Sequence, residues 1–305
     1  MTPAAARAGS PTATVSLAAL AMTAFAANSV LARLALGDGE ADAGSFTVVR
    51  LASGALVLAA LASRHTPPRQ WLAFGSWTSA AMLVVYATAF SYAYLRLGAG
   101  TGALVLFAAV QTVIFAAALR AGERPGRRGW LGLVLAGLGM VTLAAPSATA
   151  PDALGLILMI AAGTAWAVYT LRGRGTTRPV EATAANFVRG APLAIAVVIP
   201  LVALAPDSGV HMSPQGAGLA LLSGIVASGL GYAVWYLVLP RLTRVQSGLV
   251  QLTPAPLAMV AGLLLLSEPI TGQVLLASVL ILGGVALGVT RTSAAAGTPQ
   301  AAQEP

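Results

Sequence analysis

The sequence predicts an all-α membrane protein of ten transmembrane helices, arranged as two inverted repeats of five helices with both termini cytoplasmic. Composition is the first reason: 57% of the 305 residues are hydrophobic, 9% are charged, and the mean hydropathy is +0.83. These values lie far from those of a soluble globular domain. The second reason is a series of apolar windows of membrane-spanning length, and the third is a similarity between the two halves of the chain.

Several function classes are excluded by residue types that the chain lacks or scatters. It has no Cys, which removes disulfides, thiol nucleophiles and cysteine metal sites, and no Lys, which removes a retinal Schiff base. Both histidines, His65 and His211, fall between apolar windows, so no zinc pair on a helix is expected. The net charge of +8 comes from scattered arginines, which argues against nucleic acid as a partner. We expect no metal and no cofactor.

Ten windows are long enough to cross a bilayer core, which needs roughly 20 apolar residues as a helix because every backbone polar group must be satisfied within the segment. They span residues 14–36, 44–62, 71–95, 98–119, 129–145, 153–171, 183–205, 216–239, 246–266 and 272–290. The first five make the predicted first repeat, 14–145, and the last five the second, 152–290. The outer stretches, 1–13 and 291–305, are rich in Ala, Pro, Thr and Gln and are expected to be disordered cytoplasmic tails.

The first window imitates a cleaved signal peptide. Arg7, an apolar run from Val15 and the small-residue pattern Ala24-Phe25-Ala26 are its components. The apolar run continues past that pattern to Leu36, which is long enough to span, and the first repeat needs this helix. We therefore expect it to remain as the first transmembrane helix.

The placement of arginine sets the expected orientation. One side of the membrane receives 13 of the 17 arginines, namely Arg7, Arg64, Arg69, Arg120, Arg124, Arg127, Arg128, Arg172, Arg174, Arg178, Arg241, Arg244 and Arg291. The opposite connections hold Asp38, Glu40, Asp42, Asp152, Asp207 and Glu268. Because cytoplasmic loops carry the excess of arginine, both termini should be cytoplasmic, which requires an even number of helices.

The two halves match near one register. The matched segments are Arg96-Leu97 with Arg241-Leu242, Ala103-Leu104-Val105 with Gly248-Leu249-Val250, Gly122-Glu123-Arg124-Pro125 with Ser267-Glu268-Pro269, Val49-Arg50 with Val188-Arg189, and Phe25, Asn28 and Arg33 with Trp166, Tyr169 and Arg174. Because five helices is an odd number, the second copy enters the membrane in the opposite direction. Inverted repeats are typical of transporters, whose substrate site lies near the bilayer midplane between the halves.

Three features together resemble a known family: the stretch from Trp166 to Arg174, the membrane arginines Arg50 and Arg189, and Leu-Ser-Glu-Pro-Ile at 266–270. The sequence is similar over nearly its whole length to the drug/metabolite transporter superfamily, specifically its EamA-type members with two five-helix repeats. The first half departs from the family pattern, with Phe25 in place of the usual Trp and a longer segment at 121–125 in place of a compact Glu-Pro.

The resemblance implies metabolite export across the inner membrane of a bacterium, with amino-acid exporters, including the aromatic amino-acid exporter, as the nearest comparison. It also implies a central cavity between helices one, three, four, six, eight and nine. Polar and aromatic side chains within the spans are the candidate substrate-binding residues, because they are costly to leave unpaired in a membrane.

Three amides are candidates for that cavity. Asn28 in the first helix either contacts substrate or bonds a neighbouring helix. Gln111 in the fourth helix and Gln251 in the ninth lie at similar depths in the two repeats. Amides bind both an ammonium and a carboxylate group by hydrogen bonds alone, so we favour cavity lining for this pair.

Aromatic residues are the second group of candidates. Tyr86 and Phe90 lie in the third predicted helix, Trp166 and Tyr169 in the sixth, and Tyr232 and Trp235 in the eighth. Together they could form an apolar box with polar handles for amino-acid side chains. For any single member, ordinary core packing is the alternative.

Prolines are candidates for hinges or gates. Pro254 and Pro256 in the ninth helix remove backbone donors close to Gln251, which should loosen the helix and free carbonyls for ligand or water. Pro192 and Pro200 in the seventh helix could act in the same way. The alternative for all four is a packing kink without function.

Charged residues within the spans are few. Arg50 and Arg189 lie about two turns inside their helices, where they attract a substrate carboxylate or, as we favour, bind backbone carbonyls and lock each repeat. Glu123 and Glu268 are expected to be structural caps at the surface. No Asp or Glu lies deep in any window, so facilitated diffusion, exchange or indirect proton coupling is expected in place of coupling through a buried acid.

These observations predict an exporter of small metabolites, amino acids in particular, that works by alternating access. A multidrug or toxicant exporter of the same fold is the first alternative and would need acids in the cavity. An integral-membrane enzyme would need clustered His, Asp or Glu at one membrane face, and a channel would lack alternating gates. The repeat permits a self-contained monomer, with a small-molecule substrate and the lipid bilayer as partners.

Overall fold

The computed structural model describes residues 10–64, 66–122, 126–144, 152–204, 209–267 and 272–289. Within these ranges its regular elements are helices, joined by turns and short connections, with one isolated bridge between Ala41 and Met212. The predicted all-α class is confirmed. The helices are α1 (Pro11–Gly37), α2 (Ala43–Ser63), α3 (Pro68–Trp71), η1 (Leu72–Phe74), α4 (Trp77–Tyr94), α5 (Ala99–Arg120), α6 (Arg127–Ala144), α7 (Ala153–Gly173), α8 (Pro179–Leu204), α9 (Pro214–Leu222), η3 (Ser223–Leu230), α10 (Gly231–Val238), η4 (Leu239–Arg241), α11 (Arg244–Val250), α12 (Pro254–Leu266) and α13 (Gly272–Val289).

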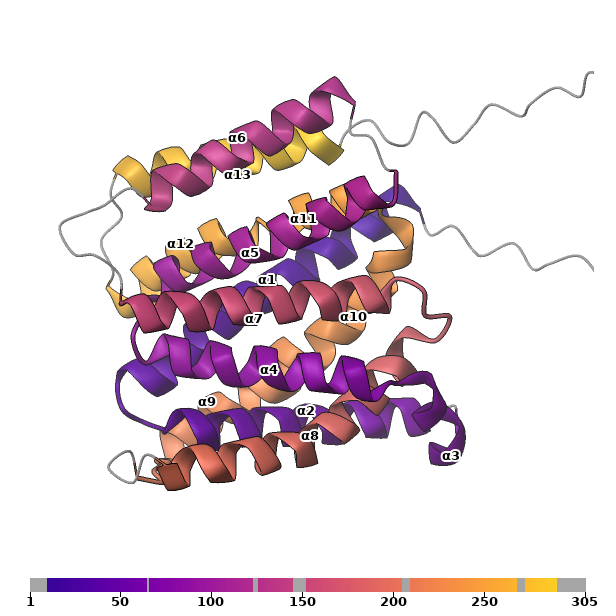
Figure 1. The fold of residues 1–305 in the computed structure, drawn as a ribbon, viewed down its shortest axis with the longest axis vertical. Helices are drawn as coiled ribbons and strands as arrows, with labels where there is room; N and C mark the ends of the chain where they lie inside the picture. The colour runs from indigo at the N-terminus through magenta and orange to yellow at the C-terminus, as the bar shows by residue number, and fades with distance from the viewer. Residues whose placement is uncertain are drawn as a thin grey trace, which may run out of the picture.

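The long helices lie side by side and run back and forth along one direction (Figure 1). α6 and α13 pair at one extreme of the long axis, α2 and α8 lie at the other, and α1, α4, α5 and α7 lie between them. α1 begins at the end of the bundle where α13 ends. We call this the arginine-rich end, because its connections hold Arg64, Arg172 and Arg241, and the opposite one the acidic end, with Asp38, Glu40, Asp42 and Asp152.

Seven helices or joined helices of the described chain are long and apolar enough to cross a membrane, and a bent pair, Pro68–Phe74 with Trp77–Tyr94, makes an eighth. They correspond to eight of the ten predicted windows. The other two windows fall on α6, which begins with two arginines, and on α13, whose apolar stretch Leu275–Gly284 is short. Glu123, Glu268 and His65 lie outside the described residues, as do the parts of the predicted tails at 1–9 and 291–305.

The third predicted window is broken, so a continuous helix from residue 71 is wrong. Trp71 ends α3, Gly75 is extended (φ −88°, ψ 172°), and α4 begins only at Trp77, after a bend of 74°. Ser76 is bonded on both sides of the break: its side chain accepts the backbone N–H of Ser79 at 3.1 Å and caps α4, and its own N–H donates to Asn186 Oδ1 of α8 at 3.0 Å.

The eighth and ninth predicted helices are each interrupted. η3 is a π-helix between α9 and α10, a form that is common at functional sites. Between α11 and α12 the prolines remove two donors, as expected. The carbonyls of Val250 and Leu252 are not free, however, because they accept the N–H groups of Thr253 (3.1 Å) and Ala255 (3.4 Å).

The acidic end is closed by contacts between the α1–α2 connection and the start of α9. The backbone N–H of Asp42 donates to the carbonyl of His211 at 2.8 Å, and the N–H of His211 donates to the Asp42 carboxylate at 3.0 Å. The N–H of Ser213 donates to the Glu40 carbonyl at 2.8 Å, and its hydroxyl donates to the Glu40 carboxylate. These contacts tie the first half of the chain to the second half at this end.

Candidate functional site

A cluster of aromatic rings occupies the middle of the bundle. Phe25 of α1, Tyr86 of α4, Trp166 of α7 and Tyr232 of α10 are all buried. The Trp166 ring lies 4.5 Å from Tyr232 and 5.2 Å from both Phe25 and Tyr86, centroid to centroid. Phe25 and Trp166 are the residues that the repeat alignment pairs, so equivalent positions of the two halves meet here.

A small void lies inside this cluster. It is lined by Phe25, Ser29, Tyr86, Phe90, Leu106, Phe107, Trp166 and Tyr232, and its volume is ≈ 10 Å³. That is about the room that one water molecule needs. The centre is therefore closed around nothing larger than water in this structure.

Arg50 of α2 lies directly behind the void and is fully buried, with 0% of its surface exposed. Its Nη2 donates to the hydroxyls of Tyr232 at 2.9 Å and Tyr86 at 3.1 Å, and its Nε donates to Ser228 Oγ at 2.8 Å. The guanidinium also lies over the rings of Tyr86 (5.2 Å) and Phe90 (4.9 Å). Among the described residues no carboxylate pairs with Arg50, so hydroxyl groups and aromatic rings take the place of a counter-charge.

Asn28 bonds neighbouring helices and reaches the same cluster. Its Oδ1 accepts the Ser223 hydroxyl at 2.6 Å, and its Nδ2 donates to the Tyr86 hydroxyl at 3.4 Å. The side chain is therefore part of the polar network behind the void. Ser223 and Ser228, both from the π-helix, complete that network.

The two glutamines do not occupy equivalent places. Gln251, between α11 and α12, accepts the indole N–H of Trp166 at 2.7 Å and donates to the Ser247 carbonyl at 3.0 Å. Gln111 of α5 lines a lateral cavity of ≈ 450 Å³ between α5 and α6, whose other walls include Phe115, Leu133 and Leu252. The structure brings Gln251 to the central cluster and Gln111 to this lateral cavity.

Gln111→Leu is expected to stabilise the protein by roughly 1 kcal/mol, because neither amide atom of Gln111 has a hydrogen-bond partner in the described chain and both are buried. Leucine has a similar volume and no polar group to leave unpaired. Thermal unfolding of the purified protein in detergent measures the effect. A lower midpoint in the variant would show that the amide has a partner in solution.

The other predicted aromatic residues surround the cluster. Tyr169 stacks on Trp166 with centroids 5.5 Å apart, Phe90 lies 5.4 Å from Tyr86, and Trp235 lies 6.1 Å from Phe25. Phe90 lines the void, whereas Tyr169 and Trp235 pack behind its walls. All three are buried.

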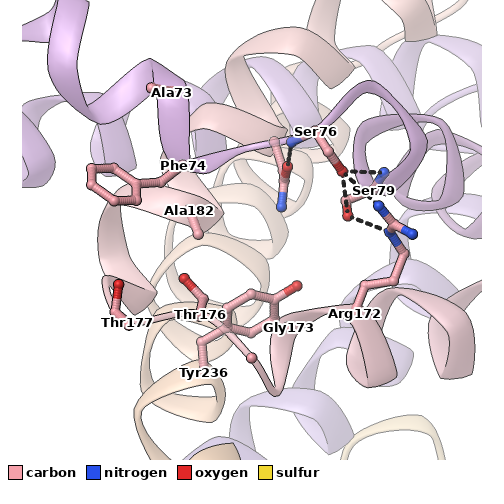
Figure 2. A pocket seen from close by; sticks show the side chains of 12 residues that line it. Ala73, Phe74, Ser76, Ser79, Arg172, Gly173, Thr176, Thr177, Ala182 and Tyr236 are labelled. Atoms are coloured by element: carbon pink, nitrogen blue, oxygen red, sulfur yellow. Dashed lines mark hydrogen bonds between the residues drawn. The ribbon is translucent and has the colours of Figure 1, made fainter.

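A polar vestibule of ≈ 440 Å³ opens at the arginine-rich end (Figure 2). Phe74, Ser76 and Ser79 form one wall, and the Arg172 guanidinium reaches across from α7 to donate to the hydroxyls of Ser79 (3.1 Å) and Ser76 (3.3 Å). Tyr236 of α10 lines its inner part. Its ring lies 5.3 Å from Tyr169, which stacks on Trp166, so adjacent aromatic rings connect the vestibule with the void.

Arg189 is held differently from Arg50. It donates to the backbone carbonyls of Ala185 (3.3 Å) and Leu72 (2.8 Å) and lies over the Trp77 ring at 5.6 Å. Arg189 thus binds backbone carbonyls, as we expected of both arginines, but Leu72 belongs to the first repeat, so this contact joins the two repeats instead of locking one. For Arg50 the expectation is wrong, because its hydrogen bonds go to side-chain hydroxyls.

Hinge candidates lie outside the central cluster. Pro192 lies inside α8, which continues through it, whereas Pro254 and Pro256 lie in the first turn of α12, next to Gln251. The sequence did not point to Ser223, Ser228 or Ser29 as site residues. Single serines among small residues carry no pattern. Ser228 and Ser223 are distinguished by their hydrogen bonds with Arg50 and Asn28, and Ser29 by its place in the wall of the void.

Two consecutive segments of the chain, 12–145 and 153–290, each match the model of the EamA-like transporter family. The chain belongs to this family. Its members are transporters rather than enzymes, and the chain is accordingly a multi-pass membrane transporter with a small-molecule substrate. The resemblance seen in the sequence is confirmed.

Individual relatives agree with this assignment. An uncharacterized protein of Pseudomonas aeruginosa is 49% identical over 90% of this chain and 93% of its own length. The threonine/homoserine exporter RhtA of Salmonella typhimurium is 32% identical over 58% of this chain and 59% of its own length. A solved crystal structure superposes with a TM-score of 0.68 over 90% of this chain and 96% of that one, at 20% identity, and so supports the fold alone.

Proposed function

We propose that this EamA-family transporter exports amino acids, including aromatic or hydrophobic ones, by alternating access through the central cavity. The observation that carries the proposal is the void walled by Phe25, Tyr86, Trp166 and Tyr232, with the polar groups of Arg50 and Asn28 behind it. Flat rings accept apolar side chains, and a few placed polar groups fix a ligand's orientation. The amino-acid exporter among the relatives supports the same class of substrate.

The proposal includes ten transmembrane helices, with α6 and α13 as the fifth and tenth, and a location in the bacterial inner membrane. Both termini are cytoplasmic in this proposal, because the arginine-rich end then faces the cytoplasm. The vestibule beside Arg172 would receive substrate from the cytoplasm, while the contacts of Asp42 and Glu40 close the other side. Inverted repeats exchange such open and closed ends during transport.

Trp166→Ala and Gln251→Ala are expected to reduce counterflow of labelled amino acids into proteoliposomes by about tenfold or more, because central aromatic anchors and their buried partners carry most of a site's binding energy. Trp166 contacts four rings and donates its only N–H to Gln251. The panel should contain phenylalanine, leucine and threonine, measured with the wild type and each variant at equal reconstituted amounts.

Gln111→Ala is the matched control, because Gln111 is an amide of the same kind that lines the lateral cavity. Counterflow should survive this substitution. Loss of counterflow in all three variants would mean that the site lies elsewhere or that the variants misfold. If the wild type shows saturable uptake of none of the amino acids, the proposed substrate class is rejected.

A multidrug or cationic-toxicant exporter is less well supported by the geometry. Recognition of a cation in a membrane cavity favours a carboxylate, and no Asp or Glu lines the void in the part of the chain that the structure describes. The charged group closest to the void is instead the guanidinium of Arg50, which repels cations.

A further inference from the structure

Resting on the proposed function, we infer that Arg50, with the hydroxyls of Tyr86 and Tyr232, anchors a carboxylate group of the transported substrate. The inference concerns the chemical group that is recognised, and it makes a carboxylate a requirement for binding. Among the described residues, the ion pairs join Arg96 with Asp152 and Arg178 with Glu181, so Arg50 has no carboxylate partner.

The groups around Arg50 provide more hydrogen-bond donors than acceptors. Its Nη1 is buried and has no partner within the described chain. The Tyr86 hydroxyl receives hydrogen bonds from Arg50 and Asn28, and the Tyr232 hydroxyl receives one from Arg50. Each phenol therefore uses its oxygen as an acceptor and retains its own proton. The Tyr232 hydroxyl also lies within hydrogen-bond reach of the Tyr86 and Ser228 hydroxyls, so Nη1 of Arg50 is the donor of this group left without a partner in the described chain.

A site with an unneutralised cation and a spare N–H donor group is complementary to an anion. A carboxylate suits it best because two acceptor oxygens match the planar fork of a guanidinium. Tyr86 and Tyr232 also line the void, whereas the guanidinium lies behind them. A carboxylate that enters the widened cavity meets the two hydroxyls first and the Arg50 charge directly behind them.

The rest of an amino acid would face the aromatic side of the same void. Phe25 and Trp166 line it together with Tyr86 and Tyr232, the two residues whose hydroxyls bond Arg50. The faces of aromatic rings attract an ammonium group as well as apolar side chains. The same void therefore offers hydroxyl groups to a carboxylate and ring faces to the remainder of the molecule.

Arg189 shows that a membrane arginine of this chain need not be an anion site. Its Nη1 and Nη2 are engaged with the carbonyls of Ala185 and Leu72, which compensate its donors. It occupies the position that the repeat alignment pairs with Arg50. It is therefore the matched control for substitutions of Arg50.

Thermal shift of the purified wild type with two matched pairs of compounds tests the inference. The pairs are L-phenylalanine with its carboxamide, and 3-phenylpropanoate with its carboxamide, which lacks the amino group. In at least one pair the acid should bind about 10- to 100-fold more tightly than the amide, the range expected for hydrogen bonds to a charged group. Equal binding of acid and amide, tighter binding of the amides, or binding of neither acid overturns the inference.

The same panel separates this inference from the proposed function. If 3-phenylpropanoate binds more tightly than its carboxamide and phenylalanine does not bind, the proposed amino-acid substrate is rejected and the carboxylate anchor is supported. Preference for phenylalanine over its amide supports both. Counterflow of phenylalanine that its amide inhibits equally well supports the amino-acid exporter and overturns the anchor.

Substitutions place the preference at Arg50. In Arg50→Gln the ratio of acid to amide affinity should fall toward 1, while Arg189→Gln should keep the wild-type ratio. Tyr86→Phe and Tyr232→Phe remove one hydroxyl each and should lower the ratio in part, which keeps the test decisive if Arg50→Gln does not fold. An unchanged ratio in all the Arg50, Tyr86 and Tyr232 variants overturns the assignment.

Discussion

Oxidation of an Ala41→Cys, Met212→Cys double variant is expected to abolish amino-acid counterflow, and reduction is expected to restore it. Ala41 and Met212 form an antiparallel bridge that joins the α1–α2 connection to the chain before α9. Opposed residues of such a bridge have Cα atoms about 4.5–5.5 Å apart, within the range that a disulfide spans. If transport requires the acidic end to open, a covalent link at this place holds the protein in the state seen here.

The chain offers a clean background for that experiment because it contains no Cys. Each single cysteine variant is a control and should transport normally with and without oxidant. Mass spectrometry of the oxidised double variant verifies that the link has formed. Full transport by fully cross-linked protein would mean that the acidic end does not open there, which would contradict alternating access through this end.

The sequence predicted the helices better than their interruptions. Eight windows match the membrane-spanning elements closely because the bilayer fixes the length of an apolar helix. The break at Gly75 is accompanied by a cap from Ser76 and a hydrogen bond of Ser76 to Asn186 of α8, and the π-helix by the close packing of Gly224 against α2. Neither changes the local hydropathy, so an apolar window cannot reveal them.

The sequence predicted which types of residue form the candidate site better than it predicted which residues contact one another there. The aromatic residues named from the sequence meet around the void, because aromatic residues in Ala-rich helices are the main source of bulk at the centre. Arg50 and Arg189 look equivalent in the repeat, yet one meets hydroxyls and the other carbonyls. Gln111 and Gln251 likewise have different surroundings, the lateral cavity for one and Trp166 for the other. The neighbours that decide these roles come from other helices, so sequence symmetry does not fix them.

Gly224→Val is expected to prevent correct folding, or to destabilise the protein by about 3 kcal/mol or more, because overpacking at a rigid contact cannot relax without moving backbone. A Cβ on Gly224 would lie 1.9 Å from Ser53 Oγ and 2.3 Å from the carbonyl oxygen of Arg50. Ser53 can rotate away, but the Arg50 carbonyl belongs to α2. Relief therefore requires η3 and α2 to separate.

That separation would also affect the site. η3 supplies Ser228 to Arg50 and Ser223 to Asn28, so any shift of η3 lengthens both hydrogen bonds. Gly218→Val in the adjoining α9 is the matched control, since nothing lies within 4 Å of the Cβ it would add. The yield of monodisperse protein and its unfolding midpoint compare the two variants. If Gly224→Val matched Gly218→Val in both, the close approach of η3 to α2, and with it the support that the π-helix gives Arg50, would not exist in the membrane.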